Sequence, residues 1–393
     1  MTVSKAELKR ANLNSYYFRK AYDNGAKVVH VNSFVPSEIL LALGLTPFNL
    51  GNIGGILAQG KASKKMINLA QQNHYSSDLC STSRCILGAA LINALPTPDF
   101  LAFTSLPCDV GSHIYFTLSQ LYGSKWFLLD VPLYYDDEEE AIAYLENQIR
   151  NLVILMEDAL DLKLDPEMLK TAITYSNEAS LYAQKTNELA RMIPSPLSAM
   201  ETMEFASAAH LLGSKEMAEM CKERYEEIKG NIRNARFEGN RKPRILWHGL
   251  RPYYTDEIFD HLEDKCKVEV ISELDVYGVF YCGWEFLDPE QPFRSLAKRM
   301  LLLQGSFSSI NEQFIRQISG RLDEYSIDGV IAYNSRGCRH MLSVSQVFRD
   351  IFNNNDRPYL EIDGDYIDDR DYSFEQIKTR IDAFAELLYG RLQ

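Results

Sequence analysis

Short runs of β-branched and aromatic residues alternate with amphipathic segments of helical spacing in the first third of the chain. This alternation is typical of β/α units that build a parallel sheet. It also predicts a glycine-rich turn at Gly51–Gly55, directly after the second strand. We expect strands at residues 26–32, 46–50, 100–105 and 125–132, and helices at residues 36–44, 61–73, 80–94 and from about 110 onward.

The middle of the chain has a different pattern, with long helical periodicities rich in Glu, Lys, Ala and Leu and hardly a strand signal. The acidic run Asp136–Glu140 opens this region, and we expect it to cap a helix because carboxylates are favoured at helix N-termini. After residue 242 the β/α alternation returns. Strands are expected at residues 244–248, 267–274, 329–334 and 357–363, and a last helix at residues 373–389.

The whole pattern predicts an α/β fold with two similar parallel-sheet domains of the Rossmann or flavodoxin-like type and a helical region between them. The glycine turn lacks the G-x-G-x-x-G order of dinucleotide-binding loops, and the chain has no Walker lysine, so NAD and direct ATP binding have no support. The expected boundaries are an N-terminal helical segment at 1–25, a first α/β domain at 26–133, a helical region at 134–241 and a second α/β domain at 242–393.

The composition narrows the class of partner. The 393 residues are 46% hydrophobic and 24% charged, and 41 Lys and Arg against 54 Asp and Glu leave a net charge of −13. This surplus of acidic residues argues against nucleic acid or an anionic membrane as a partner. No apolar run reaches about 18 residues, the length that crosses a bilayer, and no secretory leader is recognised at the start. We therefore expect a cytoplasmic protein whose seven cysteines stay reduced.

Two stretches of the chain, residues 100–108 and 330–338, match without a gap, and each ends in a cysteine. Each is followed by an amphipathic helix and by a strand that reaches an aspartate, Asp130 in the first copy and Asp363 in the second. Cys108 and Cys338 are therefore expected just beyond the carboxyl end of a parallel strand, at the entrance of a helix. Ligands bind at this edge of open α/β sheets, and a helix N-terminus lowers the pKa of a thiol.

Cys80 follows a turn-like polar stretch and is also expected at a helix entrance. Cys85 is expected in the packing, because five residues along a helix rotate the side-chain direction by about 140°. Three thiolates with few histidines nearby favour an iron-sulfur cluster over zinc. The spacing itself is not that of a ferredoxin or a zinc ribbon, because the chain has no C-x-x-C pair.

Six short motifs follow one another along the chain, at Pro36–Pro47, Asp78–Cys85, Pro107–Asp109, Ser335–Cys338, Asp363–Arg370 and Thr379–Phe384. In this order and spacing the motifs are specific. With them the chain resembles the 2-hydroxyacyl-CoA dehydratase and benzoyl-CoA reductase family, in the iron-sulfur (D-component) subunit. The likeness runs from about residue 25 to the C-terminus.

The resemblance implies two similar α/β domains that hold a [4Fe-4S] cluster between them, with Cys80, Cys108 and Cys338 at the positions of the family's ligands. It also implies a homologous second subunit in a heterodimer, and a separate ATP-hydrolysing iron-sulfur activator protein that delivers one electron. The substrate would be a CoA thioester, which the electron turns into a ketyl radical so that the α-hydroxyl can leave. A cluster with three protein thiolates leaves one iron open to water, sulfide or a substrate oxygen.

The chain departs from many relatives at a fourth cysteine, which those relatives carry in a D-x-C-x-G stretch. The nearest segment here, Glu273–Gly278, has no cysteine, and the next cysteine is Cys282. Whether Cys85 or Cys282 joins the cluster is open from the sequence. A double-cubane [8Fe-9S] cluster is the alternative cofactor and needs six cysteines, whereas Cys221 and Cys266 are expected away from the sheet edge.

No catalytic residue is assigned from the sequence. Ser33, Gly54 and Gly55 are candidate substrate contacts, because they are expected at strand ends on the same edge as the cysteines. Arg336 flanks Cys338 and is expected either to donate to cluster sulfurs or a thioester oxygen, or to form a salt bridge.

The remaining polar motifs have simpler interpretations. The acidic strand end Asp363–Asp365 does not match a calcium loop, and we expect it to accept hydrogen bonds from nearby backbone, with Arg370 or Arg380 as a partner. The histidines lack the spacing of a metal site, and each is expected to be structural. His113, just inside the helix after Cys108, is the first histidine to mutate.

The leading hypothesis is a subunit of an (R)-2-hydroxyacyl-CoA dehydratase, a lyase that forms 2-enoyl-CoA. Three alternatives remain: a benzoyl-CoA-reductase-like subunit, a double-cubane reductase of small molecules, and a non-catalytic electron carrier or structural subunit. The sequence does not say which acyl group is bound, which of two subunits this is, or whether the assembly is a homodimer or a heterodimer.

Overall fold

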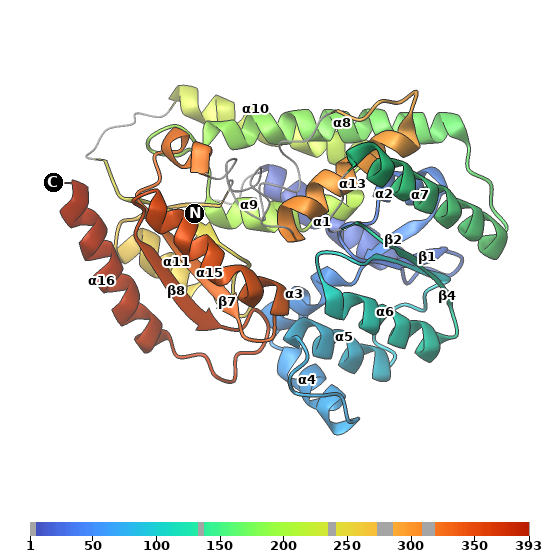
Figure 1. Cartoon of the computed structure of the whole chain (residues 1–393), viewed down its shortest axis with the longest axis horizontal. Helices are drawn as coiled ribbons and strands as arrows, with labels where there is room; N and C mark the ends of the chain where they lie inside the picture. Colours follow the sequence, from blue (N-terminus) through green and yellow to red (C-terminus); the bar gives the residue numbers. More distant parts are fainter. Residues whose placement is uncertain (1–4, 133–136, 235–240, 273–285, 309–318, 393) are drawn as a thin grey trace.

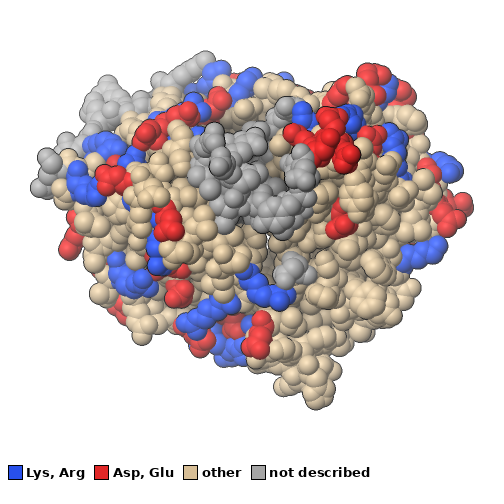
Figure 2. Space-filling view, viewed as in Figure 1, with Lys and Arg blue, Asp and Glu red and all other residues tan. Residues whose placement is uncertain are grey.

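A computed structural model of the protein describes residues 5–132, 137–234, 241–272, 286–308 and 319–392. Two separate parallel sheets lie at opposite sides of the molecule, and the long helices α8 and α10 run along the top of the view in Figure 1. On the face shown in Figure 2, basic and acidic side chains are interspersed, and no broad positive patch forms among the described residues. None of the described helices is long and apolar enough to cross a membrane.

The first sheet contains four parallel strands in the order β2-β1-β3-β4. Their bounds are Val28–Val31 for β1, Thr46–Asn49 for β2, Phe100–Thr104 for β3 and Lys125–Leu129 for β4. Every residue of β1, β2 and β3 is buried, as expected for parallel strands covered on both faces. All four strands were predicted from the apolar runs, and the prediction is confirmed.

The second sheet repeats this arrangement in the order β6-β5-β7-β8. The strands are β5 at Arg244–His248, β6 at Glu269–Ile271, β7 at Gly329–Ser335 and β8 at Tyr359–Gly364. In both sheets the second strand along the chain is at one edge, and the third strand lies between the first and the fourth. The internal repeat in the sequence is therefore also a repeat in topology, and the α/β fold class is confirmed.

Helices connect the strands of each sheet. In the first α/β half, from β1 to β4, they are α2 at Ser37–Ala42, α3 at Gly51–Gln59, α4 at Ser63–Gln72, α5 at Ser81–Leu91 and α6 at Asp109–Tyr122. In the second α/β half, from β5 to the C-terminus, they are α11 at Glu257–Asp260, the π-helix η2 at His261–Lys265, α13 at Pro292–Ser308, α15 at Arg339–Asn354 and α16 at Phe374–Leu392.

The predicted glycine-rich turn at residues 51–55 is wrong, because these residues form the first turns of α3. The glycines serve close packing instead. A Cβ atom on Gly54 would come within 3.0 Å of the Thr82 side chain, and one on Gly55 within 3.1 Å of the Tyr253 ring. The sequence signal was misleading because glycine favours turns in general, whereas here it allows two neighbouring segments to approach a helix.

The middle of the chain is helical, as predicted. It contains α7 at Glu138–Leu160, α8 at Pro166–Leu189, α9 at Ala199–Ala206, the short η1 at Ala209–Leu211 and α10 at Lys215–Asn234, and the N-terminal α1 spans Lys5–Lys20. The side chain of Asp137 accepts hydrogen bonds from the backbone N–H groups of Glu139 and Glu140, so part of the acidic run caps α7 as expected. Asp136 lies outside the described residues.

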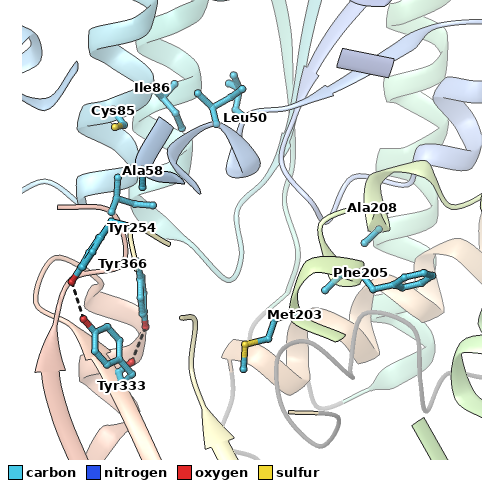
Figure 3. Packing of buried hydrophobic residues seen from close by; sticks show 14 of the residues in the cluster. Leu50, Ala58, Cys85, Ile86, Met203, Phe205, Ala208, Tyr254, Tyr333 and Tyr366 are labelled. Carbon is cyan, nitrogen blue, oxygen red and sulfur yellow. Dashed lines mark hydrogen bonds between the residues drawn. The ribbon is translucent and has the colours of Figure 1, made fainter. Parts of the chain in front are cut away.

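One large core connects the two halves. Buried residues of the first sheet, such as Phe103, belong to the same apolar cluster as Trp247 and Tyr333 of the second sheet, and Figure 3 shows members of this cluster. A second cluster lies between the first sheet and α7, and Leu296 and Met300 of α13 complete it. The chain of the second half therefore crosses back to cover the first sheet, which no sequence pattern indicated.

Candidate functional site

Cys80, Cys108 and Cys338 each occupy the residue that precedes the first turn of a helix, namely α5, α6 and α15. The carbonyl oxygen of Cys80 accepts a hydrogen bond from Arg84, and that of Cys338 accepts one from Leu342, which are the first bonds of their helices. A helix N-terminus carries a partial positive charge and stabilises nearby anions such as thiolates. All three cysteines therefore have the same electrostatic setting.

Cys108 and Cys338 also occupy equivalent places in the two sheets. Cys108 follows β3 and Cys338 follows β7, and these are the third strands of their halves. Parallel strands end at a common edge, where ligands bind in open α/β sheets. The two halves thus each present a cysteine at a ligand-binding edge, as the internal repeat predicted.

Cys80 and Cys108 both lie within electrostatic range of Cys338. The pKa of the Cys338 thiol is raised to about 12, mainly by burial and to a smaller extent by the charges of Cys80 and Cys108, although the N–H groups of Met341 and His340 lower it. Ionisation of the Cys338 thiol is therefore unfavourable unless a cation binds it. A cluster of iron ions would supply that positive charge, so the donor set and its electrostatics fit an iron-sulfur centre.

The three thiols differ in their access to solvent. Cys108 is exposed, whereas Cys80 and Cys338 are half-buried. In a cubane each thiolate binds a different iron, so the sulfurs need not be as close together as the ligands of a single metal ion. The exposed side of the trio, at Cys108, is the side on which a small molecule or another protein can approach.

Gly337 allows the two halves to meet at this point. A Cβ atom on Gly337 would lie 3.0 Å from the Cα atom of Cys80 and 3.6 Å from the carbonyl oxygen of Leu79. Backbone cannot move away as a flexible side chain can, so any side chain at residue 337 would push the Cys338 loop away from the Cys80 loop. The glycine in the Ser335–Cys338 motif is therefore explained by close approach.

The Asp363–Arg370 motif, in the second α/β half, forms a hydrogen bond with the loop that carries Cys80 in the first half. Oδ1 of Asp365 accepts hydrogen bonds from the Ser81 hydroxyl at 2.5 Å and from the N–H groups of Ile367 at 2.8 Å and Asp368 at 2.9 Å. The expected hydrogen bonding to nearby backbone is confirmed for Asp365. The bond to Ser81 could not be foreseen, because it joins residues 284 positions apart.

Arg84 also connects the Cys80 loop to the second half, and no sequence pattern predicted this role. It is buried, its Nε atom donates to the carbonyl oxygen of Leu79 at 2.9 Å, and its guanidinium lies 3.7 Å from the Asp368 carboxylate. Burial raises the pKa of Asp368, but the hydrogen bonds from Arg370 and the charge of Arg84 outweigh burial and lower it overall. The position of Arg84 inside the Asp78–Cys85 motif was the only available signal.

Three tyrosines form a hydrogen-bonded group (Figure 3), and of these only Tyr366 belongs to one of the sequence motifs. The Tyr254 and Tyr333 hydroxyls lie 3.2 Å apart, Tyr333 donates to the carbonyl oxygen of Asp365, and Tyr366 donates to the carbonyl oxygen of Tyr333. Burial raises the pKa of Tyr366 well above its usual value, and the Cys338 charge raises it further. These hydroxyls therefore stay protonated and hold the ends of β7 and β8 in place.

The predicted substrate contacts occupy different settings. The Ser33 hydroxyl, just after β1, accepts a hydrogen bond from Asn49 at 2.9 Å. Gly54 and Gly55 are buried in α3. The Arg336 side chain is 64% exposed and lies 3.5 Å from Asp371, which is the salt bridge expected as one of its two options. Contact of these residues with a substrate stays a prediction.

The other described cysteines have separate environments. Cys85 is fully buried, burial raises the pKa of its thiol to about 12, and Figure 3 shows it among apolar side chains. Cys221 is buried in α10, and Cys266 contacts Asp382. Cys282 lies outside the described residues. These environments differ from the helix N-termini that Cys80, Cys108 and Cys338 occupy.

Comparisons with known proteins show which family the chain resembles. The 2-hydroxyglutaryl-CoA dehydratase, D-component, family matches residues 32–388. The chain is 21% identical to the alpha subunit of lactoyl-CoA dehydratase of Anaerotignum propionicum, over 95% of this chain and 93% of that protein. It is 24% identical to the (R)-2-hydroxyisocaproyl-CoA dehydratase alpha subunit of Clostridioides difficile, over 95% and 92%. A benzoyl-CoA reductase subunit of Thauera aromatica is 23% identical, over 93% and 90%.

Proposed function

The chain belongs to the 2-hydroxyglutaryl-CoA dehydratase, D-component, family, and from this premise we propose that it is the iron-sulfur subunit of an (R)-2-hydroxyacyl-CoA dehydratase. The relatives named as dehydratases support a lyase that removes water from a 2-hydroxyacyl-CoA thioester. The observation that carries the proposal is that Cys80, Cys108 and Cys338, from both α/β halves, each precede a helix, and that Cys80 and Cys108 both act electrostatically on Cys338.

In this proposal the three cysteines hold a [4Fe-4S] cluster. When bound, such a cluster supplies a low-potential electron, received from an ATP-hydrolysing activator protein, that converts the thioester carbonyl to a ketyl radical and makes the α-hydroxyl a feasible leaving group. The chain's own residues would hold the cysteines in place for the cluster. The N–H groups of His340 and Met341 stabilise the Cys338 thiolate, and Ser81, Asp365 and Arg84 fix the loop that carries Cys80.

The described cysteines support a [4Fe-4S] cluster over a double-cubane cluster. A double cubane needs six thiolates, but Cys85 is buried and its thiol donates to the Ser63 carbonyl oxygen, and Cys221 is buried in α10. Three thiolates leave one iron open to a substrate oxygen. In the proposal Arg336, which is exposed and paired with Asp371, would leave Asp371 and donate to a thioester oxygen.

The proposed assembly contains three proteins. The relatives are named as single subunits of larger enzymes, which supports a homologous partner subunit for this chain. The exposed side of the trio at Cys108 is where we place the CoA thioester and the approach of the activator. The six described cysteines form no disulfide with one another, which is consistent with a reducing cytoplasm. The shared strand order, second-first-third-fourth, supports a flavodoxin-like type for each half.

A benzoyl-CoA-reductase-like activity is the second candidate, and the match to the benzoyl-CoA reductase subunit of Thauera aromatica favours it. Both reactions use a one-electron donor next to a CoA thioester, and the cysteine trio serves both equally. The substrate separates them. An anaerobic assay with activator and partner subunit, offered an (R)-2-hydroxyacyl-CoA and benzoyl-CoA, should give an enoyl-CoA product from the first and no ring reduction of the second.

The test of the cluster is metal analysis after anaerobic purification. The wild-type chain should contain about four irons, and Cys338→Ser should lose most of them together with the visible absorption of the cluster. Cys221→Ser, in the buried face of α10, is the matched control and should keep its iron. Normal iron content and an unchanged spectrum in Cys338→Ser would reject the proposal.

A further inference from the structure

A second group of ligand-type side chains lies on the outer side of the second α/β half. His261 begins η2, Cys266 directly follows it, and Asp382 is in α16, which forms one outer edge of the molecule away from α5 and α6 (Figure 1). Among the residues that the structure describes, these are the only three His, Cys, Asp or Glu whose ligand atoms all lie within 4.8 Å of one another. The cluster proposed above does not use them.

The local backbone explains why His261 and Cys266 face the same way. On an α-helix, residues five apart point about 140° away from each other. Here the N–H group of Cys266 donates to the carbonyl oxygen of His261 at 2.9 Å, which closes a π-turn. A π-turn contains more residues per turn than an α-helix and therefore brings residues five apart toward one face, and such turns are frequent at functional sites. The conformation thus creates a pair of ligands that the sequence spacing alone would separate.

The third side chain comes from α16 and approaches this pair directly. His261 Nε2 lies 2.5 Å from Oδ1 of Asp382, and the Cys266 thiol donates to the same oxygen at 3.5 Å. In a tetrahedral zinc site with ordinary bond lengths, nitrogen and oxygen ligands are about 3.4 Å apart and sulfur and oxygen ligands about 3.6 Å apart. The sulfur–oxygen distance already fits, and a side-chain movement of about 1 Å by Asp382 would open the nitrogen–oxygen distance.

The surroundings allow that movement and favour a cation. The Asp382 side chain is 43% exposed, whereas the His261 ring is held at 9% exposure, edge-on to Phe374. Burial and the hydrogen bond to Asp382 raise the pKa of the Cys266 thiol to about 11. A divalent cation would displace this proton, and it would then bind a neutral imidazole, a thiolate and a carboxylate, the donor types that zinc prefers.

The same geometry does not support a thiol-based catalytic triad. In such a triad the thiol must contact the imidazole, which takes its proton. In this group the thiol and the imidazole both contact the same oxygen, Oδ1 of Asp382. A shared carboxylate oxygen is instead the arrangement expected when three ligands surround one ion.

We propose that His261, Cys266 and Asp382 bind a zinc ion, with water as the fourth ligand, and that the ion fastens the C-terminal helix α16 to η2. The site goes beyond the dehydratase function. The Tyr389 hydroxyl of α16 also donates to the carbonyl oxygen of Lys267, so a second contact already joins the helix to the same turn. Zinc would add a stronger link at the point where Asp382 is partly exposed.

The experiment is zinc binding by the full-length holoprotein, purified anaerobically and titrated with zinc against a chromophoric chelator. The wild type should bind about one zinc per chain in addition to its iron. His261→Gln and Cys266→Ser should each weaken zinc binding by more than about tenfold and leave the iron content unchanged. His210→Gln and Cys221→Ser, which alter a histidine and a cysteine outside the group, should bind zinc as the wild type does.

Two further measurements keep the proposal testable if a variant folds poorly. Cobalt added to the wild type should give a near-ultraviolet sulfur-to-cobalt absorption band, which Cys266→Ser should lack. Zinc should raise the thermal unfolding midpoint of the wild type and of Cys338→Ser, but not that of Asp382→Asn, which keeps the size of the side chain. A wild-type chain that shows no saturable zinc binding and no cobalt band would overturn the proposal, whatever its iron content.

Discussion

The two α/β halves have the same strand order, and yet they contribute to the cysteine site in different ways. Each places one cysteine after its third strand, Cys108 in the first half and Cys338 in the second. Their fourth strands end differently. After β4, Asp130 is exposed and accepts a hydrogen bond from Tyr144 of α7, whereas after β8, Asp365 reaches across to Ser81 beside Cys80. The repeat therefore accounts for the positions of Cys108 and Cys338. The contact between Asp365 and the Cys80 loop has no counterpart in the first half.

The halves also differ in how they cover each other. From the second half, α13 crosses to the first sheet, where Leu296 and Met300 complete a core with α7. An ion pair accompanies this crossing: Arg299 of α13 donates to both carboxylate oxygens of Glu38 in α2, at 2.6 and 2.8 Å, and Ser176 donates to Glu38 at 2.5 Å. The first half therefore depends on the second half for part of its core packing and for the hydrogen bonds and ion pair that hold the Cys80 loop.

Among the substitutions considered, removing the charge of Arg299 should lower the free energy of unfolding the most. In Arg299→Met the Glu38 carboxylate, which is 0% exposed, would lose its counter-ion, and breaking a buried pair in this way costs about 3–5 kcal/mol of unfolding free energy. The double variant Glu38→Met, Arg299→Met should recover much of the loss, because it leaves no buried charge. Urea unfolding of the three proteins measures this. Equal stability of Arg299→Met and the wild type would mean that α13 is not held by this pair.

Removing the Asp365 carboxylate should have a smaller effect on stability and a specific effect on iron. Asp365→Ala removes three hydrogen bonds to one half-buried carboxylate oxygen. Because water can replace part of them, we expect a loss of about 1.5–3 kcal/mol in total. Because Ser81 adjoins Cys80, we also expect a reduced iron content after anaerobic purification. The matched control is Asp130→Ala at the corresponding strand end, which should change stability by less than about 0.5 kcal/mol and keep its iron. Equal iron loss in the two variants would contradict the asymmetry.

The sequence predicted the parts of the structure that depend on local pattern. The eight strands follow from apolar runs, and the places of Cys108 and Cys338 follow from matching residues 100–108 with 330–338. It failed where a residue's role depends on a distant neighbour. Gly54 and Gly55 read as turn residues because Tyr253 and Thr82, which pack on them, are far away in the chain. The roles of Arg84 and Ser81 were invisible for the same reason, since Asp368 and Asp365 are more than 280 positions away.

The central strands of the two halves differ in the buried polar group that they carry. In β5, Arg244 has a fully buried side chain, and it is paired with Glu269 at 2.7 Å and donates to the Met192 carbonyl oxygen. In β1, His30 is fully buried between the rings of Phe48 and Tyr122. Burial lowers the pKa of His30 to about 3, so this histidine is neutral in the folded chain at neutral pH, whereas Arg244 is charged and compensated.

The smallest predicted effect is the pH dependence that His30 creates. An unfolded histidine binds a proton near pH 6.5, but the folded His30 does not until about pH 3. Stability from this group is therefore complete above pH 6.5 and falls as the pH drops, by about 1.4 kcal/mol for each pH unit. His210, whose pKa burial lowers to about 4, adds a second loss of stability in the same direction.

Urea unfolding at pH 7.0 and pH 5.5 measures this effect. His30→Phe should lose less unfolding free energy between the two pH values than the wild type does. The control His113→Gln, at an exposed histidine, should lose as much as the wild type. An equal loss of unfolding free energy in all three proteins would mean that groups other than His30 cause the acid sensitivity.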